Sequence, residues 1–203
     1  MCFPHKMWVK EWQRYQSKHH NHVGSKKAFI IDRITPPVCY IYDDLKDHRC
    51  HVCKTPKADA LTVSGWQAYH ICVDGGLIRY GCRNYMWDFR FPQGRCDSIV
   101  FNRNDLWFIE LKMNTTSMLD NMLWKEMLEG MKQLSGFIYN LRYKMSKKHT
   151  PLERYYSVGE DVNHQHCTIC MKKYPTMNPT RNNQLEKFRL QTKLKLQQLV
   201  VIP

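Results

Sequence analysis

Three charged residues lie inside two apolar segments that a short polar turn separates. The segment RCDSIVFNRNDLWFIELKMN (residues 95–114) carries Asp97 in its first apolar run and Glu110 and Lys112 in its second. Charged groups are costly within apolar strands unless a partner compensates them. Two carboxylates can hold a divalent cation, and a neighbouring ammonium group can act on a phosphate ester, so these residue types suggest metal-assisted hydrolysis.

The flanking elements decide whether these side chains meet. Residues 96–101 and 106–113 are rich in β-branched and aromatic residues, and the sequence NRND between them is typical of a turn. The segment is therefore predicted to form a β-hairpin.

The register of this hairpin follows from its turn. A turn centred between the two runs pairs Phe101 with Leu106 and places Asp97 directly opposite Glu110. Opposite residues of a hairpin point to one face, with Cβ atoms about 5 Å apart. Lys112 lies two residues beyond Glu110 and shares that face, so we expect the two acids and the lysine to converge.

Two interpretations of this trio are open. Asp97 and Glu110 can bind Mg²⁺ or Mn²⁺, while Lys112 orients water or stabilises charge at a phosphate. Alternatively, Lys112 only neutralises the two acids at a strand edge. The bare pattern also recurs at Asp32 and Asp44-Leu45-Lys46, in a segment where we expect no strand to align the side chains.

At these residues the sequence resembles the PD-(D/E)XK nuclease superfamily, whose signature lies on two adjacent strands followed by a helix. Asp97 and Glu110-Leu111-Lys112 match that signature, and Gln133 in MKQLSG matches a helical glutamine that faces the site in many members. The resemblance covers roughly residues 60–200. It implies that Asp97, Glu110 and the Leu111 carbonyl hold Mg²⁺ or Mn²⁺, that Lys112 is catalytic, and that Gln133 supports the site.

The sequence departs from the family pattern in two places. Arg95-Cys96 precede Asp97, so the proline that names the motif is absent. Many members carry a further acid on an earlier helix, for which Asp59 and Asp74 are the candidates here. Because some members have lost catalysis, fold and activity are separate questions.

The rest of the chain is predicted to complete an α/β fold. Residues 117–141 have helical apolar spacing, with Ser117 as N-cap and Asp120 in the first turn. Further strands are expected at residues 38–42, 60–63, 69–73, 77–80, 165–172 and 198–203, and further helices at 5–20 and 181–195. Alternating strands and helices indicate an α/β domain with a mixed sheet. The resemblance implies that this domain has the restriction-endonuclease-like architecture, a mixed central sheet flanked by helices. We expect a basic N-terminal extension with a short helix at 1–35 and the nuclease-like domain at 36–203.

The charge indicates a polyanionic partner. The 203 residues contain 31 Lys and Arg against 18 Asp and Glu, a formal charge of +13, which favours nucleic acid. As substrate of the nuclease interpretation, DNA is favoured over RNA. No apolar run is long enough to span a membrane. Nine cysteines without an export signal suggest reduced thiols in the cytoplasm or another reducing compartment. Whether the chain forms a homodimer or a larger assembly stays open.

Cysteine pairs offer a competing metal site. Cys50 and Cys53 can contribute to a structural Zn²⁺ site, and a second CxxC lies at Cys167–Cys170. The second pair is expected inside a strand, where its two thiols would point to opposite faces. Three functions therefore remain: a metal-dependent nuclease, which we favour; an inactive nuclease-fold module for nucleic-acid binding or assembly; and a zinc-stabilised interaction domain.

Overall fold

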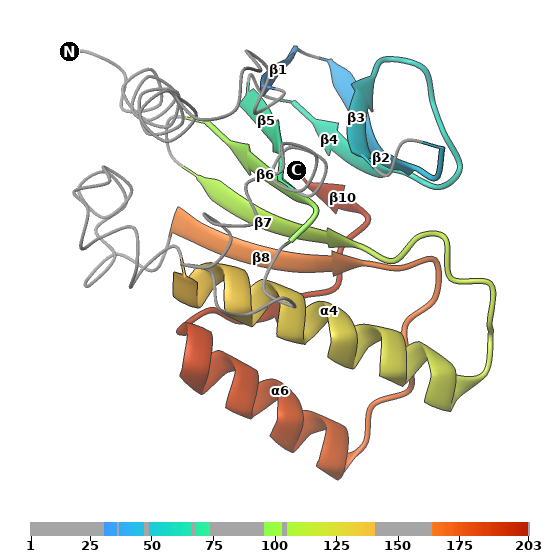
Figure 1. Ribbon diagram of the computed structural model, residues 1–203, viewed down its shortest axis with the longest axis vertical. Coiled ribbons are helices and arrows are strands. Elements are labelled where there is room, and N and C mark those ends of the chain that lie inside the picture. Colours follow the sequence, from blue (N-terminus) through green and yellow to red (C-terminus); the bar gives the residue numbers. More distant parts are fainter. Residues whose placement is uncertain are drawn as a thin grey trace, which may run out of the picture.

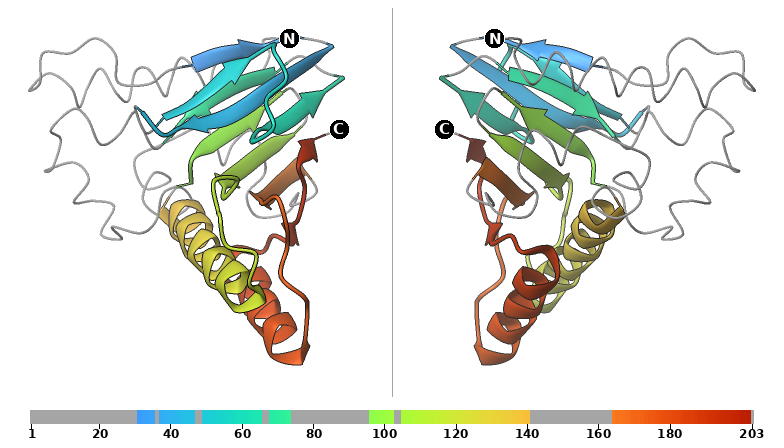
Figure 2. Two further views of the ribbon diagram at one scale, coloured as in Figure 1. Left: turned by 90° about the vertical axis from the view of Figure 1, so that its right-hand side faces the viewer. Right: turned by 90° about the vertical axis from the view of Figure 1, so that its left-hand side faces the viewer.

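The computed structural model describes residues 31–35, 37–46, 49–65, 68–73, 96–102, 105–140 and 164–202. These residues form a six-stranded sheet (sheet A), a four-stranded sheet (sheet B) and two helices, α4 and α6 (Figure 1). The two helices lie side by side, and the side views show them on the opposite side of the molecule from the strands of sheet B (Figure 2). The fold is mixed α/β.

The elements follow one another in the chain with these bounds: β1 (Ile31–Ile34), β2 (Val38–Asp44), β3 (Arg49–Cys53), β4 (Leu61–Ser64), β5 (Ala68–Cys72), β6 (Ser98–Phe101), β7 (Leu106–Leu111), α4 (Asp120–Asn140), β8 (Gln165–Cys170), α6 (Pro179–Thr192), β9 (Leu196–Gln197) and β10 (Val201–Ile202). Sheet A has the order β1-β5-β6-β7-β8-β9, and sheet B has the order β10-β4-β2-β3. Both sheets mix parallel and antiparallel pairs.

The predicted hairpin is confirmed as β6 and β7. Phe101 pairs with Leu106 and Ser98 with Ile109, the register expected from the turn. Beyond the last pair, the Asn102 N–H donates to the Asp105 carbonyl at 3.0 Å. At the far end of this ladder, the backbone of Asp97 is therefore aligned with that of Glu110, as predicted.

Helix α4 connects two parallel neighbours of sheet A. The chain leaves β7, returns along α4, and enters β8, which pairs with β7 in parallel. Two parallel neighbours need such a crossover because the chain must return to the end of the sheet where the first strand began before it enters the second strand. Neither helix among the described residues is long and apolar enough to cross a membrane.

Both faces of β7 are buried, and this explains the second sheet. All six residues of β7 are buried. Phe108 faces α4, where its ring lies 6.1 Å from that of Phe137. Trp107 and Ile109 face sheet B and pack in a second core with residues such as Ile41. A strand that is apolar on both faces needs a layer on each.

The architecture therefore differs from the one predicted. One mixed central sheet flanked by helices was expected, whereas among the described residues α4 covers one face of sheet A and a second sheet, sheet B, covers the other. Sheet B was missed because β3 lies in a polar, cysteine-bearing segment. The burial of β3 depends on pairing with β2 rather than on its own apolar pattern.

Several local predictions also need correction. Residues 31–34 were assigned to the N-terminal extension but form β1, which pairs with β5. Ser117 does not cap α4, which begins at Asp120; the Ser117 hydroxyl instead accepts the Leu119 N–H at 3.3 Å. Asp120 is in the first turn of α4, as expected. The predicted helix at 5–20 and strand at 77–80 lie outside the described residues.

The second copy of the acidic pattern does lie on strands, contrary to expectation. Asp32 belongs to β1 and Asp44 ends β2. These strands belong to different sheets, so they are not hydrogen-bonded neighbours. Only the copy in the hairpin places its acids on adjacent strands.

Gly130 of α4 provides a test of how closely α4 packs on sheet A. A Cβ atom there would lie 2.9 Å from Ile169 Cδ1 and 3.2 Å from Glu110 Cγ. Gly130→Ala should destabilise the fold by about 1 kcal/mol, because overpacking outweighs the gain in helix propensity of about 1 kcal/mol. Urea unfolding measures the change. Exposed Lys132→Ala on the same helix is the control and should stay within about 0.5 kcal/mol; a stabilising Gly130→Ala would contradict the close contact.

Candidate functional site

Asp97 and Glu110 lie opposite each other where β6 begins and β7 ends, and Glu110 lies on the face of sheet A that packs against α4. Asp97 immediately precedes β6, and its carbonyl accepts the Val73 N–H at 2.9 Å, so the β5–β6 ladder continues through it. One step beyond the Ser98–Ile109 pair, the register sets Asp97 against Glu110. The contact distance calculated at Gly130 shows that Glu110 points toward α4.

Buried thiols on both faces of sheet A sense the charge of Asp97: Cys96 packs on the α4 side, and Cys50 and Cys170 pack on the sheet B side. Burial raises the pKa of Cys96 well above its ordinary value, and the charges of Glu110 and Asp97 raise it further. One side chain thus senses both acids. The register predicted for Asp97 and Glu110 is confirmed by the β6–β7 pairing. The Asp97 carboxylate itself lies at the end of the ladder, where it reaches the Leu111 N–H.

Lys112 forms an ion pair with Glu110. Its Nζ lies 3.1 Å from Glu110 Oε1, and the two side chains are 16% and 0% exposed. Burial opposes the charge of Lys112, but the charge and hydrogen bond of Glu110 outweigh it, and Asp97 and Glu129 add to the effect. The pKa of Lys112 is therefore raised. Its stabilising contribution is complete below the ordinary lysine pKa and is lost as the pH rises through the raised value.

Asp97 is held by the backbone of the neighbouring strand. Its Oδ2 accepts the Leu111 N–H at 2.6 Å. The next N–H, that of Lys112, points the other way and donates to the Cys170 carbonyl of β8 at 2.8 Å. Because N–H and C=O of one residue in an extended strand project to the same side, the Leu111 carbonyl is directed toward the Asp97 side.

Gln133 lies on the side of α4 that packs on sheet A. Gly130, Gln133 and Phe137 follow helical spacing on one stripe. Gly130 lies against Glu110, and Phe137 contacts Phe108, two residues earlier in β7. Gln133 therefore lies between these two levels. Its Oε1 atom is buried and accepts no hydrogen bond from the described residues.

The donor set suits a hard divalent cation. Two carboxylates, a backbone carbonyl directed toward them and water are the oxygen ligands that Mg²⁺ and Mn²⁺ prefer. The described residues contain no group of three His, Cys, Asp or Glu side chains placed to hold a metal. Asp97, Glu110 and the Leu111 carbonyl could contribute protein oxygens to such an ion, and water would have to supply the remaining ligands.

A pocket of about 410 Å³ opens beside Lys112, where β7 ends. Its acidic lining residues, Asp43 from β2 and Glu126 from α4, were not identified in the sequence analysis. Glu126 lies one helical turn before Gly130 and two turns before Gln133. Helical spacing from Gln133 could therefore have identified Glu126 as a residue on the same side of the helix. Asp43 gave none, because only tertiary packing brings β2 to this edge.

Asp59, one of the two acids proposed for an earlier helix, does not lie on a helix. Asp59 lies in the turn before β4 and pairs with Lys172 at 2.7 Å, away from any described helix. Asp74 lies outside the described residues.

The cysteine pairs lie on strands. Cys50 and Cys53 are three residues apart in β3, so their side chains project to opposite faces. Burial raises the pKa of Cys50 well above its usual value, which disfavours the thiolate that zinc needs. Cys167 and Cys170 of β8 pack in different cores, on opposite faces of sheet A as predicted.

The ion pair should be measurable as a coupling energy. Lys112→Met leaves the buried Glu110 carboxylate without its cation and should destabilise the fold by about 3 kcal/mol at neutral pH. Adding Glu110→Gln removes that charge and should recover at least about 1 kcal/mol. Urea unfolding of both single variants and the double variant gives the coupling. Strictly additive effects would show that the pair does not stabilise the fold.

Comparisons of the chain with models of known protein families, with curated proteins and with solved structures found no significant match. The function must therefore be argued from the site itself, namely two opposed carboxylates, a paired lysine and an adjoining pocket.

Proposed function

We propose that the protein is a metal-dependent nuclease that hydrolyses phosphodiester bonds of nucleic acid, with DNA favoured over RNA. The observation that carries the proposal is the placement of Asp97 and Glu110 opposite each other, with Lys112 on the same face. Like charges directly opposite destabilise a sheet. A bound divalent cation would turn that repulsion into attraction.

The arrangement around the trio supports a PD-(D/E)XK-like core. The two acidic strands are adjacent and antiparallel, and helix α4 follows them before β8 joins β7 in parallel. This is the order of elements that the resemblance implies around the signature. Sheet B would then be an addition that covers the second face of the core.

In this proposal Asp97, Glu110 and the Leu111 carbonyl hold Mg²⁺ or Mn²⁺. When bound, the ion would polarise the scissile phosphate and lower the pKa of coordinated water. The Leu111 N–H keeps the Asp97 carboxylate in place, so at least one ligand is oriented before binding.

Lys112 and Gln133 complete the proposed site. The ion pair with Glu110 fixes the Lys112 ammonium group next to the pocket, where it can stabilise negative charge on a phosphate oxygen. The buried Gln133 Oε1 can accept a hydrogen bond from a water near the acids. Neither role requires a movement of the backbone.

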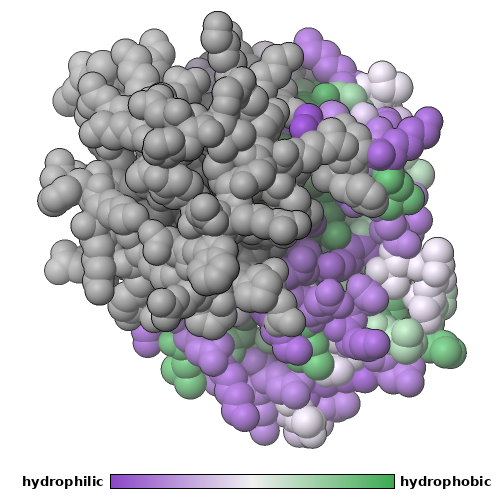
Figure 3. Space-filling view, viewed as in Figure 1, coloured by the Kyte–Doolittle hydropathy of each residue, from purple (hydrophilic) through white to green (hydrophobic). Residues whose placement is uncertain are grey.

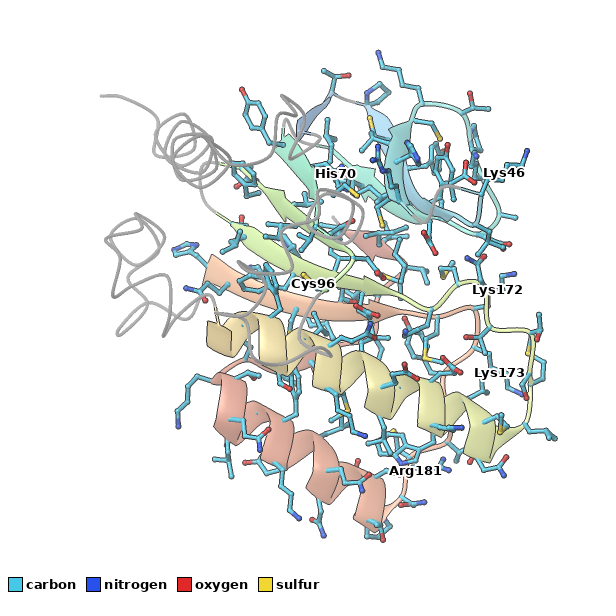
Figure 4. All side chains as sticks on the ribbon, in the orientation of Figure 1. Lys46, His70, Cys96, Lys172, Lys173 and Arg181 are labelled. Atoms are coloured by element: carbon cyan, nitrogen blue, oxygen red, sulfur yellow. The ribbon has the colours of Figure 1, made fainter. Side chains whose placement is uncertain are left out.

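Basic side chains near the same edge would bind the phosphate backbone. Figure 4 shows Lys46, Lys172 and Lys173 along the side of the molecule where β7 and β8 end. Lys172 follows β8 by two residues, and Cys170, the last residue of that strand, accepts the Lys112 N–H. The net charge of +13 favours the same polyanionic partner.

A second candidate is a catalytically inactive nucleic-acid-binding or assembly module with the same fold. The observation in its favour is that Lys112 neutralises Glu110, and Leu111 holds Asp97, without any ion. Such a trio can be purely structural. Cleavage and metal dependence distinguish the two candidates.

The catalytic prediction is tested on supercoiled plasmid, linear DNA and RNA with Mg²⁺, Mn²⁺ or EDTA. Cleavage should require a divalent cation. Asp97→Ala should abolish both cleavage and the rise in melting temperature with Mg²⁺, because it removes a ligand. Lys112→Ala should retain the metal-dependent melting shift but slow turnover by about 100-fold.

The controls separate chemistry from folding. Melting curves of each variant without metal identify any that fail to fold. If wild-type protein cleaves none of the three substrates with either cation, the inactive module becomes the better explanation. If Lys112→Ala cleaves at the wild-type rate, the lysine has no catalytic role.

Binding should depend steeply on salt. About four phosphate contacts would lower affinity roughly 100-fold between 50 and 200 mM salt, because counterions are released on binding. Lys173→Gln should reduce the slope of log affinity against log salt by about one. Lys187→Gln, an exposed lysine in the middle of α6, is the matched control. Fluorescence anisotropy in EDTA measures both, and a salt-independent affinity would argue against phosphate contacts.

A further inference from the structure

The pocket beside Lys112 lies where the three layers meet at the end of β7. Sheet B contributes residues at the end of β2, sheet A the last part of β7, and the helical layer the start of α4. The loop between β7 and α4 closes the remaining side. The lining residues are Asp43, Leu45, Leu111, Lys112, Asn114, Thr115, Thr116, Ser117, Met122 and Glu126.

Two walls of the pocket carry apolar side chains that the fold leaves exposed. Leu45 is 63% exposed and Met122 is 39% exposed. They belong to the turn after β2 and to the first turn of α4, which come from the layers on opposite sides of sheet A. The described surface in Figure 3 is otherwise mostly hydrophilic, with hydrophobic residues in small separate patches. Exposed apolar groups that line one pocket are suited to cover the faces of a flat ligand.

The polar lining favours a neutral group that donates hydrogen bonds. Asp43 and Glu126 carry carboxylates, which accept but do not donate. Their negative charge repels a phosphate. Asn114, Thr115 and Thr116 add side chains that can both donate and accept.

A metal ion is a poorer occupant of this pocket. The described residues provide no group of three His, Cys, Asp or Glu side chains placed to bind one. The exposed Leu45 and Met122 would contribute nothing to a cation. A planar group with apolar faces and an edge of N–H donors uses both kinds of lining.

We propose that this pocket binds an unpaired nucleobase with an exocyclic amino group, next to the phosphate that Lys112 faces. The inference deepens the proposed nuclease function and rests on it. Leu45 and Met122 would contact the faces of the base, and Asp43 and Glu126 would accept hydrogen bonds from its amino edge. That edge is occupied by pairing in a duplex, so the substrate presents a single-stranded or extruded nucleotide at the site.

The surrounding charges agree with this placement. Lys46 directly follows Leu45 in the chain, while Lys172 and Lys173 lie along the same side of the molecule (Figure 4). Phosphates on either side of the bound nucleotide can therefore contact lysines outside the pocket. The carboxylates of Asp43 and Glu126 inside the pocket would contact only the base.

The test measures binding without cleavage. Fluorescence anisotropy with the full chain in EDTA compares ten-nucleotide strands of dA, dC and dT with a ten-unit abasic backbone of equal charge. The dA and dC strands should bind about 10-fold more tightly than the abasic strand, since covering the faces of one base with apolar side chains contributes roughly that factor. The affinity of the dT strand, whose base lacks an amino group, should lie between the affinity of the dA and dC strands and that of the abasic strand.

Variants assign the preference to the pocket. Leu45→Ser and Met122→Ser should each reduce the advantage of dA over the abasic strand at least about 3-fold, because they remove an apolar wall. Leu190→Ser, a 54% exposed leucine on α6 outside the pocket, is the matched control and should leave it unchanged. Glu126→Gln keeps the side-chain size but adds a donor, so it should narrow the difference between dA and dT.

The outcomes separate this inference from the nuclease proposal. Equal binding of abasic and base-bearing strands, or equal effects of Leu45→Ser and Leu190→Ser, would overturn the base pocket even if Mg²⁺-dependent cleavage is observed. A base preference that depends on Leu45 and Met122, without cleavage in Mg²⁺ or Mn²⁺, would support the pocket and overturn the nuclease. Failure to bind any strand at low salt would overturn both.

Discussion

The carboxylate of Glu110 is a charge placed inside the core, and the surrounding structure is arranged to tolerate it. Glu110 is fully buried on a strand whose six residues are all buried. An uncompensated charge there would cost several kcal/mol. Lys112 provides the compensation, and it can do so only because an extended strand returns every second side chain to the same face. The strand geometry, the ion pair and the burial thus depend on one another.

The same buried carboxylate restricts the helix that covers it. Gly130 is the α4 residue that lies against Glu110, and there is no room for a methyl group. A glycine in the middle of a helix is unfavourable by about 1 kcal/mol relative to alanine. The close approach of α4 explains why that cost is accepted here.

The paired lysine links the structural and catalytic interpretations of the trio. In the metal-free protein, the Lys112–Glu110 contact lowers the energy of a buried charge. In the proposed enzyme, the same contact holds an ammonium group beside the pocket. Catalytic groups are commonly placed beside charges that shift their pKa. Lys112 can therefore both stabilise the buried Glu110 carboxylate and act in catalysis. The pocket itself exists because sheet B and α4 both extend beyond the end of β7.

The sequence by itself determined the hairpin, its register and the shared face of Glu110 and Lys112. Turn chemistry and the alternation of side chains are local properties, and they persist whatever packs above the strand. The body of α4 and the opposite orientation of Cys167 and Cys170 were predictable for the same reason. The placement of Gln133 on the side of α4 that packs on sheet A followed from helical spacing.

Only the tertiary structure decided what covers the second face of β7 and what adjoins Lys112. β3 has too few apolar residues for its sequence to predict a strand. The pairing of β1 with β5 joins segments almost 40 residues apart in the chain. Asp43, Leu45, Met122 and Glu126 come together only when sheet B and α4 pack on opposite faces of sheet A. Such contacts arise from the burial of whole layers, which local periodicity does not encode.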